Sequence, residues 1–379
     1  MKCARFLLVL MPALALAIPA YAEPRELELN DSQVAGSVIV FPKFIQGRVT
    51  LPEGGTAPKT EIEIGIVCPE GETCAEHQPV KLRFHWVCPG SQDFAQKLVC
   101  RETNFVVTAT VFEKIVLSPD GVFSGVTTKT VPAAPCPRGY LIGWVIRPSD
   151  DQPIKFDGLI GNAAIRETGS ALASYSAIPI QANPNMAHMA PIDDEGDALF
   201  FDGGPNHYQA LTSEAYGDIR YTSAAGGTPP FATAFITLLT LDVLSNRPNN
   251  PVFVPLTFYG GFNSAIGNEN ALSSFTEFVC WEQVRVDVVI HPSLTTTLMG
   301  RKGVVEFSQA KKEAWAGIVD HTGPVTLLGL IETIEVPTAG GPRATALREY
   351  ITPLFNDGDV VPTCFVPAEG TACKLNNGG

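Results

Sequence analysis

The sequence lacks the short motifs by which many enzymes are recognised. It has no G-x-S-x-G, no H-E-x-x-H, and no glycine-rich phosphate-binding loop following a predicted strand. None of its six histidines has a second histidine at helical spacing. A catalytic triad or carboxylate pair assembled from distant residues remains possible. The sequence therefore leaves enzymatic activity undecided and favours a non-enzymatic function.

Basic residues are also scarce. Lysine and arginine number 26 against 39 acidic residues, which gives a formal net charge of −13. A surface of this sign repels phosphate backbones and anionic lipid headgroups. Nucleic-acid binding and polybasic membrane association are therefore disfavoured.

The only long apolar run stands at the start of the sequence. Lys2 and Arg5 precede the run Phe6 to Ile18, and a small-x-small site, Ala20-Tyr21-Ala22, follows it. This layout predicts a cleaved secretory signal over residues 1–22. The run has 13 residues, whereas a bilayer core needs roughly 20. We expect a protein without a membrane span, secreted to the cell surface or beyond, with the periplasm as the other possible destination.

Cleavage of this leader changes the cysteine count and the charge. Cys3 leaves with it, so eight of the nine cysteines remain, and loss of two basic residues moves the charge from −13 to −15. The chain contains no C-x-x-C, and its cysteine spacings do not match those of common zinc sites. Export therefore favours disulfides. The spacing suggests Cys88–Cys100 and Cys364–Cys373, with Cys68–Cys74 possible and with Cys136 and Cys280 either joined to each other or buried as thiols.

Strand patterns dominate the rest of the chain. Val80 to Trp86 and Ile62 to Ile66 alternate between apolar and polar or small residues, which predicts strands with one buried face. Tyr140–Ile146 and Ala234–Leu244 are continuous apolar runs that predict central strands. Only Ser308–Ile318 has a helical pattern. The predicted fold is all-β, with two β-sandwich domains of jelly-roll or immunoglobulin-like type and at most one or two short helices.

The boundary between these domains is expected within 182–197, ANPNMAHMAPIDDEGD, which interrupts two strand-rich segments. The predicted domains are residues 23–185 and 186–379. Five cysteines of the mature chain fall in the first and three in the second. Both numbers are odd, so if every cysteine is paired, at least one disulfide must join the two domains.

An acidic cluster is the candidate metal site, because clustered carboxylates suit calcium. Its members are Asp193, Asp194, Glu195, Asp197 and Asp202. The cluster is not an EF-hand loop, since position twelve from Asp193 is Gly204. A solvated acidic linker is the alternative interpretation, and His188 or His207 could add a transition-metal ligand.

Polar loops beside strands form a second candidate site. Asn246–Asn250, Asn263 and the run Asn268-Glu269-Asn270 lie near Tyr259 and Phe262, and aromatic rings beside amides can hold sugars. Asparagine is equally a preferred turn residue. Asp242, within an apolar run, is either a buried carboxylate with a raised pKa or a strand-end residue that bonds to a turn.

Three segments carry a resemblance to known proteins: CPRGYLIGWVI (136–146), LLTLDVLSNRPNNP (238–251) and TEFVCWEQVRV (276–286). They resemble segments of uncharacterised secreted proteins from environmental bacteria. The resemblance implies a bacterial, exported, β-rich protein and assigns no functional residues.

The expected function is structural or adhesive, with self-association through exposed strand edges or binding to surface glycans. The alternatives are a carbohydrate-binding or glycan-hydrolysing protein and a calcium-dependent surface module.

Overall fold

The structure is a computed structural model. It describes residues 34–51, 53–90, 100–124, 129–166, 173–186, 199–211, 215–221, 231–241, 250–260, 272–285, 301–307, 311–312, 323–336 and 347–349. These residues form strands, turns and irregular segments, with no helix among them, and every strand pairing they make is antiparallel. The prediction of an all-β fold is confirmed for this part of the chain.

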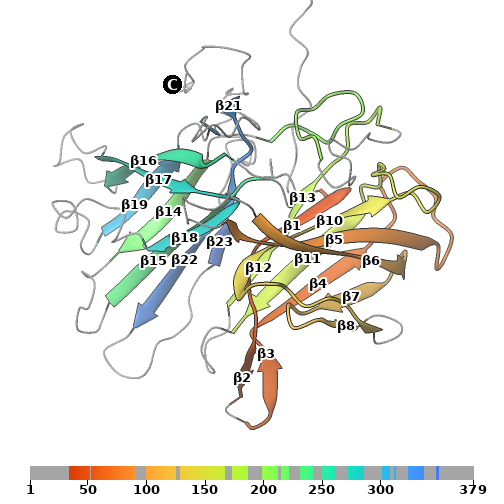
Figure 1. Cartoon of the computed structure of the whole chain (residues 1–379), viewed down its shortest axis with the longest axis horizontal. Coiled ribbons are helices and arrows are strands. Elements are labelled where there is room, and N and C mark those ends of the chain that lie inside the picture. Colours follow the sequence, from red (N-terminus) through yellow and green to blue (C-terminus); the bar gives the residue numbers. More distant parts are fainter. Residues whose placement is uncertain are drawn as a thin grey trace, which may run out of the picture.

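The N-terminal half, defined here as strands β1 to β13, contains two main sheets (Figure 1). The five-stranded sheet has the order β13 (Ile178–Ile180), β1 (Val38–Ile45), β10 (Arg138–Ile146), β5 (Pro79–Gly90), β6 (Cys100–Thr110). The six-stranded sheet has the order β12 (Ala173–Ser176), β11 (Leu159–Ile165), β4 (Thr60–Ile66), β7 (Lys114–Leu117), β8 (Val122–Ser124), β9 (Lys129–Thr130). A hairpin of β2 (Arg48–Thr50) and β3 (Thr56–Pro58) lies apart from both.

Side-chain alternation explains why these two sheets pack together. Ile62, Ile64 and Ile66 of β4 are buried, while the residues between them are partly exposed. On β5, Leu82 and Phe84 join the same core. Because successive side chains of a strand point to opposite faces, each sheet directs one apolar row at the other. The predicted alternation of both strands is confirmed.

Strand β10 is central and is buried on both faces over Gly139–Ile146, as its apolar run predicts. Leu141 and Val145 face the core shared with the six-stranded sheet. Tyr140, Ile142 and Trp144 face a second cluster, which also contains residues from beyond position 198. The five-stranded sheet is therefore covered on both sides.

The C-terminal half, defined here as strands β14 to β23, also contains two sheets (Figure 1). One has β14 (Ala215–Tyr221), β19 (Arg301–Phe307), β16 (Val252–Gly260), β20 (Lys311–Lys312) and β21 (Gly323–Pro324) in that order, with β17 (Leu272–Phe278) also paired to β16. The other has the order β18 (Trp281–Arg285), β15 (Phe231–Leu239), β22 (Leu328–Val336), β23 (Leu347–Glu349). Strand β15 is thus an inner strand, as the run Ala234–Leu244 predicts.

The helix predicted at Ser308–Ile318 is wrong where the structure describes it. Lys311 and Lys312 form β20, which pairs with Val252 and Phe253 of β16 and with β21. Sheet pairing supplies hydrogen-bond partners to this backbone and overrides a weak local helix preference. The remainder of Ser308–Ile318 lies outside the described residues.

The segment around the predicted boundary packs on the N-terminal half. Ala182 forms a bridge with Tyr208, and Met186, Phe201 and Leu211 lie in the second cluster with Trp144. The domain limits 23–185 and 186–379 stay a prediction. Within the part of the chain described, no helix is long and apolar enough to cross a membrane.

Candidate functional site at the junction of the two halves

A bulge in β1 directs a lysine out of the N-terminal half. The pairing of β1 with β10 shifts register between Phe41 and Phe44, so Pro42 and Lys43 interrupt the ladder. The hydroxyl of Tyr175 contacts the backbone N and O of Lys43 on one side. Trp281 of the C-terminal half donates from Nε1 to the carbonyl of Pro42 at 2.8 Å. The bulge is therefore held by both halves, as expected of a feature that re-aims a side chain.

The facing surface belongs to the four-stranded sheet. Gln283 of β18 lies opposite Thr237 of β15, and Thr237 lies opposite Leu330 of β22. Glu332 stands two residues further along β22, so its side chain shares the face of Leu330 and Gln283. Two strands that flank β15 thereby present an amide and a carboxylate side by side.

These side chains meet in a polar cluster, named the junction cluster and defined as Lys43, Arg138, Gln283 and Glu332. Lys43 Nζ donates to Glu332 Oε2 at 2.6 Å, and Gln283 Nε2 donates to the same oxygen at 2.6 Å. Arg138 Nη1 donates to Gln283 Oε1 at 2.8 Å. An amine, a carboxylate, a carboxamide and a guanidinium thus form one continuous hydrogen-bonded chain.

The end of the junction cluster formed by Lys43 and Glu332 is buried. The side chains of Lys43 and Glu332 are 1% and 7% exposed, whereas Arg138 is exposed and Gln283 is half-buried. An ion pair withdrawn from water is weak evidence for stability, because desolvation offsets the attraction. Removing either partner would leave an uncompensated buried charge. Each of these two buried charges therefore depends on the other half of the molecule for its partner.

A disulfide closes the same junction. Cys100 of β6 bonds to Cys280, which directly precedes β18, with a Cα–Cα distance of 6.2 Å. Gly90 N donates to Val279 O at 2.9 Å, and Tyr140 Oη donates to Thr240 O at 3.2 Å. Backbone, side-chain and covalent links therefore all connect the five-stranded sheet to the C-terminal half. The Cys100–Cys280 disulfide joins a cysteine of the predicted segment 23–185 to one of 186–379, as expected if every cysteine is paired.

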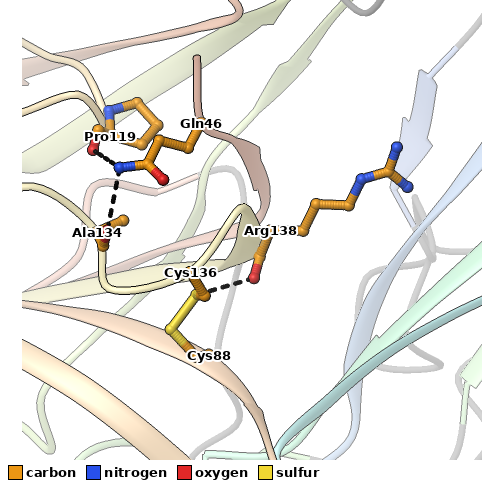
Figure 2. Close-up of a disulfide and its surroundings, with 6 residues drawn as sticks. All are labelled: Gln46, Cys88, Pro119, Ala134, Cys136 and Arg138. Atoms are coloured by element: carbon orange, nitrogen blue, oxygen red, sulfur yellow. Dashed lines mark hydrogen bonds between the residues drawn. A yellow bond between two sulfur atoms is a disulfide. The ribbon is translucent and has the colours of Figure 1, made fainter.

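The predicted bridge Cys88–Cys100 is wrong, and the faces of the sheet explain the error. Cys88 belongs to the core between the two N-terminal sheets, whereas Cys100 belongs to the cluster on the opposite face. Cys88 instead bonds to Cys136, with a Cα–Cα distance of 5.9 Å (Figure 2). Closeness in sequence cannot compensate for side chains that point to opposite faces.

The Cys88–Cys136 disulfide anchors the start of β10. Cys136 Sγ contacts the carbonyl oxygen of Arg138 at 3.0 Å, and the nearby Gln46 donates from Nε2 to Pro119 O and Ala134 O (Figure 2). Figure 2 shows the Arg138 side chain extending away from the sulfur atoms. The disulfide thus fixes the backbone from which Arg138 reaches the junction cluster.

The remaining cysteine predictions have different outcomes. Cys68–Cys74, treated as possible, is present with a Cα–Cα distance of 5.7 Å. Cys136 and Cys280 are neither joined to each other nor free thiols, since each bonds to a cysteine of β5 or β6. Cys364 and Cys373 lie outside the described residues.

Of the predicted calcium ligands, the structure describes only Asp202. Its Oδ1 accepts hydrogen bonds from Gly204 N at 2.9 Å and from His207 Nδ1 at 2.5 Å, and its side chain is 61% exposed. Asp193, Asp194, Glu195, Asp197 and His188 lie outside the described residues. The residues that are described contain no group of three or more metal-ligating side chains. Calcium binding therefore stays a prediction. The contact that the structure does show for Asp202 is with His207, within one turn.

The predicted sugar-binding loops lie almost wholly outside the described residues, as does Asp242. The exceptions are Asn250, which is fully buried, and Tyr259, which lies in β16 opposite Val304 of β19. The residues of the junction cluster were not anticipated. A signal was present, since Lys43 stands in the apolar strand VIVFPKFI and Glu332 in LGLIETIEV. A charge inside an apolar strand needs a partner, but the sequence does not say which one.

The sequence matches no protein-family model and no curated protein.

Proposed function

We propose that this protein is an exported, non-enzymatic structural or adhesive protein that acts at or beyond the cell surface. In this proposal each half is a β-sandwich domain of jelly-roll or immunoglobulin-like type. The Cys100–Cys280 disulfide carries the proposal, because it locks the two halves together and such bonds persist in oxidising compartments. The predicted leader over residues 1–22 also supports export from the cytosol.

The physical advantage of this construction is resistance to separation. A load applied between the halves acts on a covalent bond and on a buried polar contact, as well as on apolar packing. Two further disulfides, Cys68–Cys74 and Cys88–Cys136, constrain the N-terminal half. Cross-links of this kind limit the expansion of the unfolded chain, which suits a protein that works outside the cell.

Self-association through a strand edge has one supporting feature. Strand β6 spans eleven residues without proline and pairs with β5 but with no other strand of the described part. A long edge strand can accept a strand from another chain. Binding to surface glycans is the alternative partnership.

Expression of the full chain in a secreting bacterium tests the export proposal. We expect a mature N-terminus at Glu23 and almost no thiol labelling of the unfolded, unreduced protein. An uncleaved, reduced chain recovered from the cytosol would contradict the proposal. The same mature protein then goes into a glycan array and a hydrolase screen, where a saturable sugar ligand or turnover would replace the structural function with the carbohydrate-directed one.

The calcium-dependent alternative needs a separate measurement. Thermal unfolding of the mature protein is compared with and without a chelator, because a ligand bound only by the folded state raises its stability. An unchanged midpoint is expected for the structural protein. A midpoint lowered by the chelator and restored by calcium would favour the calcium-dependent module.

A further inference from the structure

We propose that the junction cluster forms an isopeptide bond between Lys43 Nζ and Gln283 Cδ. The bond would join the two halves covalently at a second place, 240 positions apart in the chain and independent of the disulfides. It does not depend on export, since no oxidant is required. Nothing in the proposed function needs this modification, so the two can fail separately.

The two side chains that react share one hydrogen-bond acceptor. The amine of Lys43 and the carboxamide of Gln283 both donate to Glu332 Oε2, each at 2.6 Å. Lys43 Nζ and Gln283 Nε2 therefore lie no more than twice 2.6 Å apart, and the carbon to be attacked is bonded to Nε2. Attack requires Nζ to approach Cδ to about 3–3.5 Å, and a fold that holds the two side chains beside each other makes this approach an intramolecular step.

The nucleophile is the amine of Lys43. An ammonium cannot attack a carbonyl, so Lys43 must first lose a proton, and Glu332 is the base that touches it. Both side chains are almost fully withdrawn from water. Glu332 Oε2 lies 2.6 Å from Lys43 Nζ and is therefore placed to accept the proton.

Arg138 activates the electrophile. Its Nη1 donates to Gln283 Oε1 at 2.8 Å, on the oxygen where negative charge develops when an amine attacks the carbonyl carbon. A donor preorganised at that oxygen stabilises the tetrahedral intermediate. The arrangement therefore favours Gln283 as the residue that is modified.

The reaction balances without a co-reactant. The Lys43 ammonium gives one proton to Glu332, and the amine attacks Cδ of Gln283. The tetrahedral intermediate then loses Nε2, which collects the proton held by Glu332 and another from the attacking nitrogen. The C–Nε2 bond breaks, the new C–Nζ bond remains, and Nε2 leaves as an ammonium ion. Glu332 ends as a carboxylate.

The surrounding contacts hold the groups in register. Pro42 O accepts from Trp281 Nε1, two residues before Gln283 on β18, so the bulge and the electrophile are fixed to each other. Tyr175 fixes the backbone of Lys43 from the other side. Strands β18 and β22 are both paired to β15, which fixes Gln283 relative to Glu332.

The test is the mass of the full chain, purified, unfolded and with all disulfides reduced. We expect a mass one ammonia below that of the reduced sequence after any leader cleavage, and a protease digest with a branched peptide containing Lys43 and Gln283. Lys43→Arg keeps the buried charge but removes the primary amine, and Gln283→Leu keeps the approximate size but removes the amide. Both variants should have the full mass.

Glu332→Gln separates the proposed chemistry from mere proximity, since it leaves the amine and the amide in place and removes the base. We expect the branched peptide to be lost from this variant. Glu63→Gln is the matched control, because it breaks an exposed glutamate–lysine pair, Glu63–Lys114, within the N-terminal half. It should retain the branched peptide in the wild-type amount. Circular dichroism of each variant establishes that the chain is folded.

Three results would overturn the proposal. The first is a folded wild-type chain of full mass after prolonged incubation. The second is the loss of water with a branch between Lys43 and Glu332, which would make Glu332 the acceptor. The third is the loss of ammonia at any other place in the peptide map. If Glu332→Gln does not fold, a full-mass Gln283→Leu protein beside a branched wild type still supports the bond.

Discussion

Trp281 and Trp144 are both buried tryptophans, but their indole nitrogens have different surroundings. Trp281 Nε1 donates to Pro42 O at 2.8 Å across the junction. Trp144 Nε1 is buried without a hydrogen-bond partner among the described residues. A buried donor with a partner stabilises the fold, while one without a partner costs desolvation. The two tryptophans therefore allow the contribution of one buried hydrogen bond to be compared with its absence.

Trp281→Phe and Trp144→Phe remove the same atoms, so the loss of volume is similar. We expect Trp281→Phe to lower the free energy of unfolding by about 1 to 3 kcal/mol more than Trp144→Phe, because it also leaves the Pro42 carbonyl without its donor. Urea unfolding of the two variants measures the difference. Equal destabilisation would show that the hydrogen bond contributes little to the junction.

The carboxyl group of Glu282 should make the free energy of unfolding depend on pH. Burial raises the pKa of its carboxyl group, and a hydrogen bond accepted from the backbone of Gln283 partly offsets that rise. The folded state therefore keeps this proton to a higher pH than the unfolded chain. Its contribution to stability falls as pH rises through the interval between the ordinary and the raised pKa.

We expect Glu282→Gln to increase the free energy of unfolding above that interval and to change it little below the ordinary carboxyl pKa. Urea unfolding over a series of pH values measures this, with Glu277→Gln as the control because Glu277 is exposed. A benefit of equal size at every pH, or a benefit only in acid, would contradict the assignment.

At the scale of an element, β10 depends on close approach to its neighbour. A Cβ atom at Gly139 would stand 2.1 Å from Val87 O, a backbone atom of β5 that cannot rotate away. At Gly65 of β4 the nearest atom is Cγ1 of Ile160 at 3.1 Å, and this side chain is partly exposed. The same substitution should therefore have different costs on the two strands.

Gly139→Ala should lower the free energy of unfolding by about 1 to 3 kcal/mol through strain in the ladder of β5 and β10. Gly65→Ala should change it by less than about 1 kcal/mol, because Ile160 can move. Chemical denaturation compares the two proteins. A larger loss for Gly65→Ala would contradict the spacing described for these strands.

At the scale of the whole molecule, the disulfides differ in the length of chain that they close. Cys100–Cys280 spans 180 positions and joins the halves, whereas Cys68–Cys74 spans six within one half. The entropy that a cross-link removes from the unfolded chain grows with the logarithm of this length. The long bridge should therefore contribute more to stability.

Replacing both cysteines of a pair by alanine avoids leaving an odd thiol. We expect the Cys100→Ala/Cys280→Ala protein to lose about 5 kcal/mol and the Cys68→Ala/Cys74→Ala protein about 2 kcal/mol, from the chain-entropy relation. Guanidinium unfolding of the oxidised proteins measures both. Similar losses would mean that strain or residual structure, rather than loop length, sets the effect.

Local patterns in the sequence determined the all-β class and the strands β4, β5 and β10, and they predicted a disulfide between the halves on the condition that every cysteine is paired. They could do so because side-chain alternation and cysteine parity are properties of the chain itself. Tertiary structure alone decided that Cys88 pairs with Cys136, that Lys311 and Lys312 lie in a strand, and that Lys43 meets Glu332. Each of these outcomes depends on which sheet face a residue occupies and which distant strand lies opposite, and the spacing of residues along the chain carries neither.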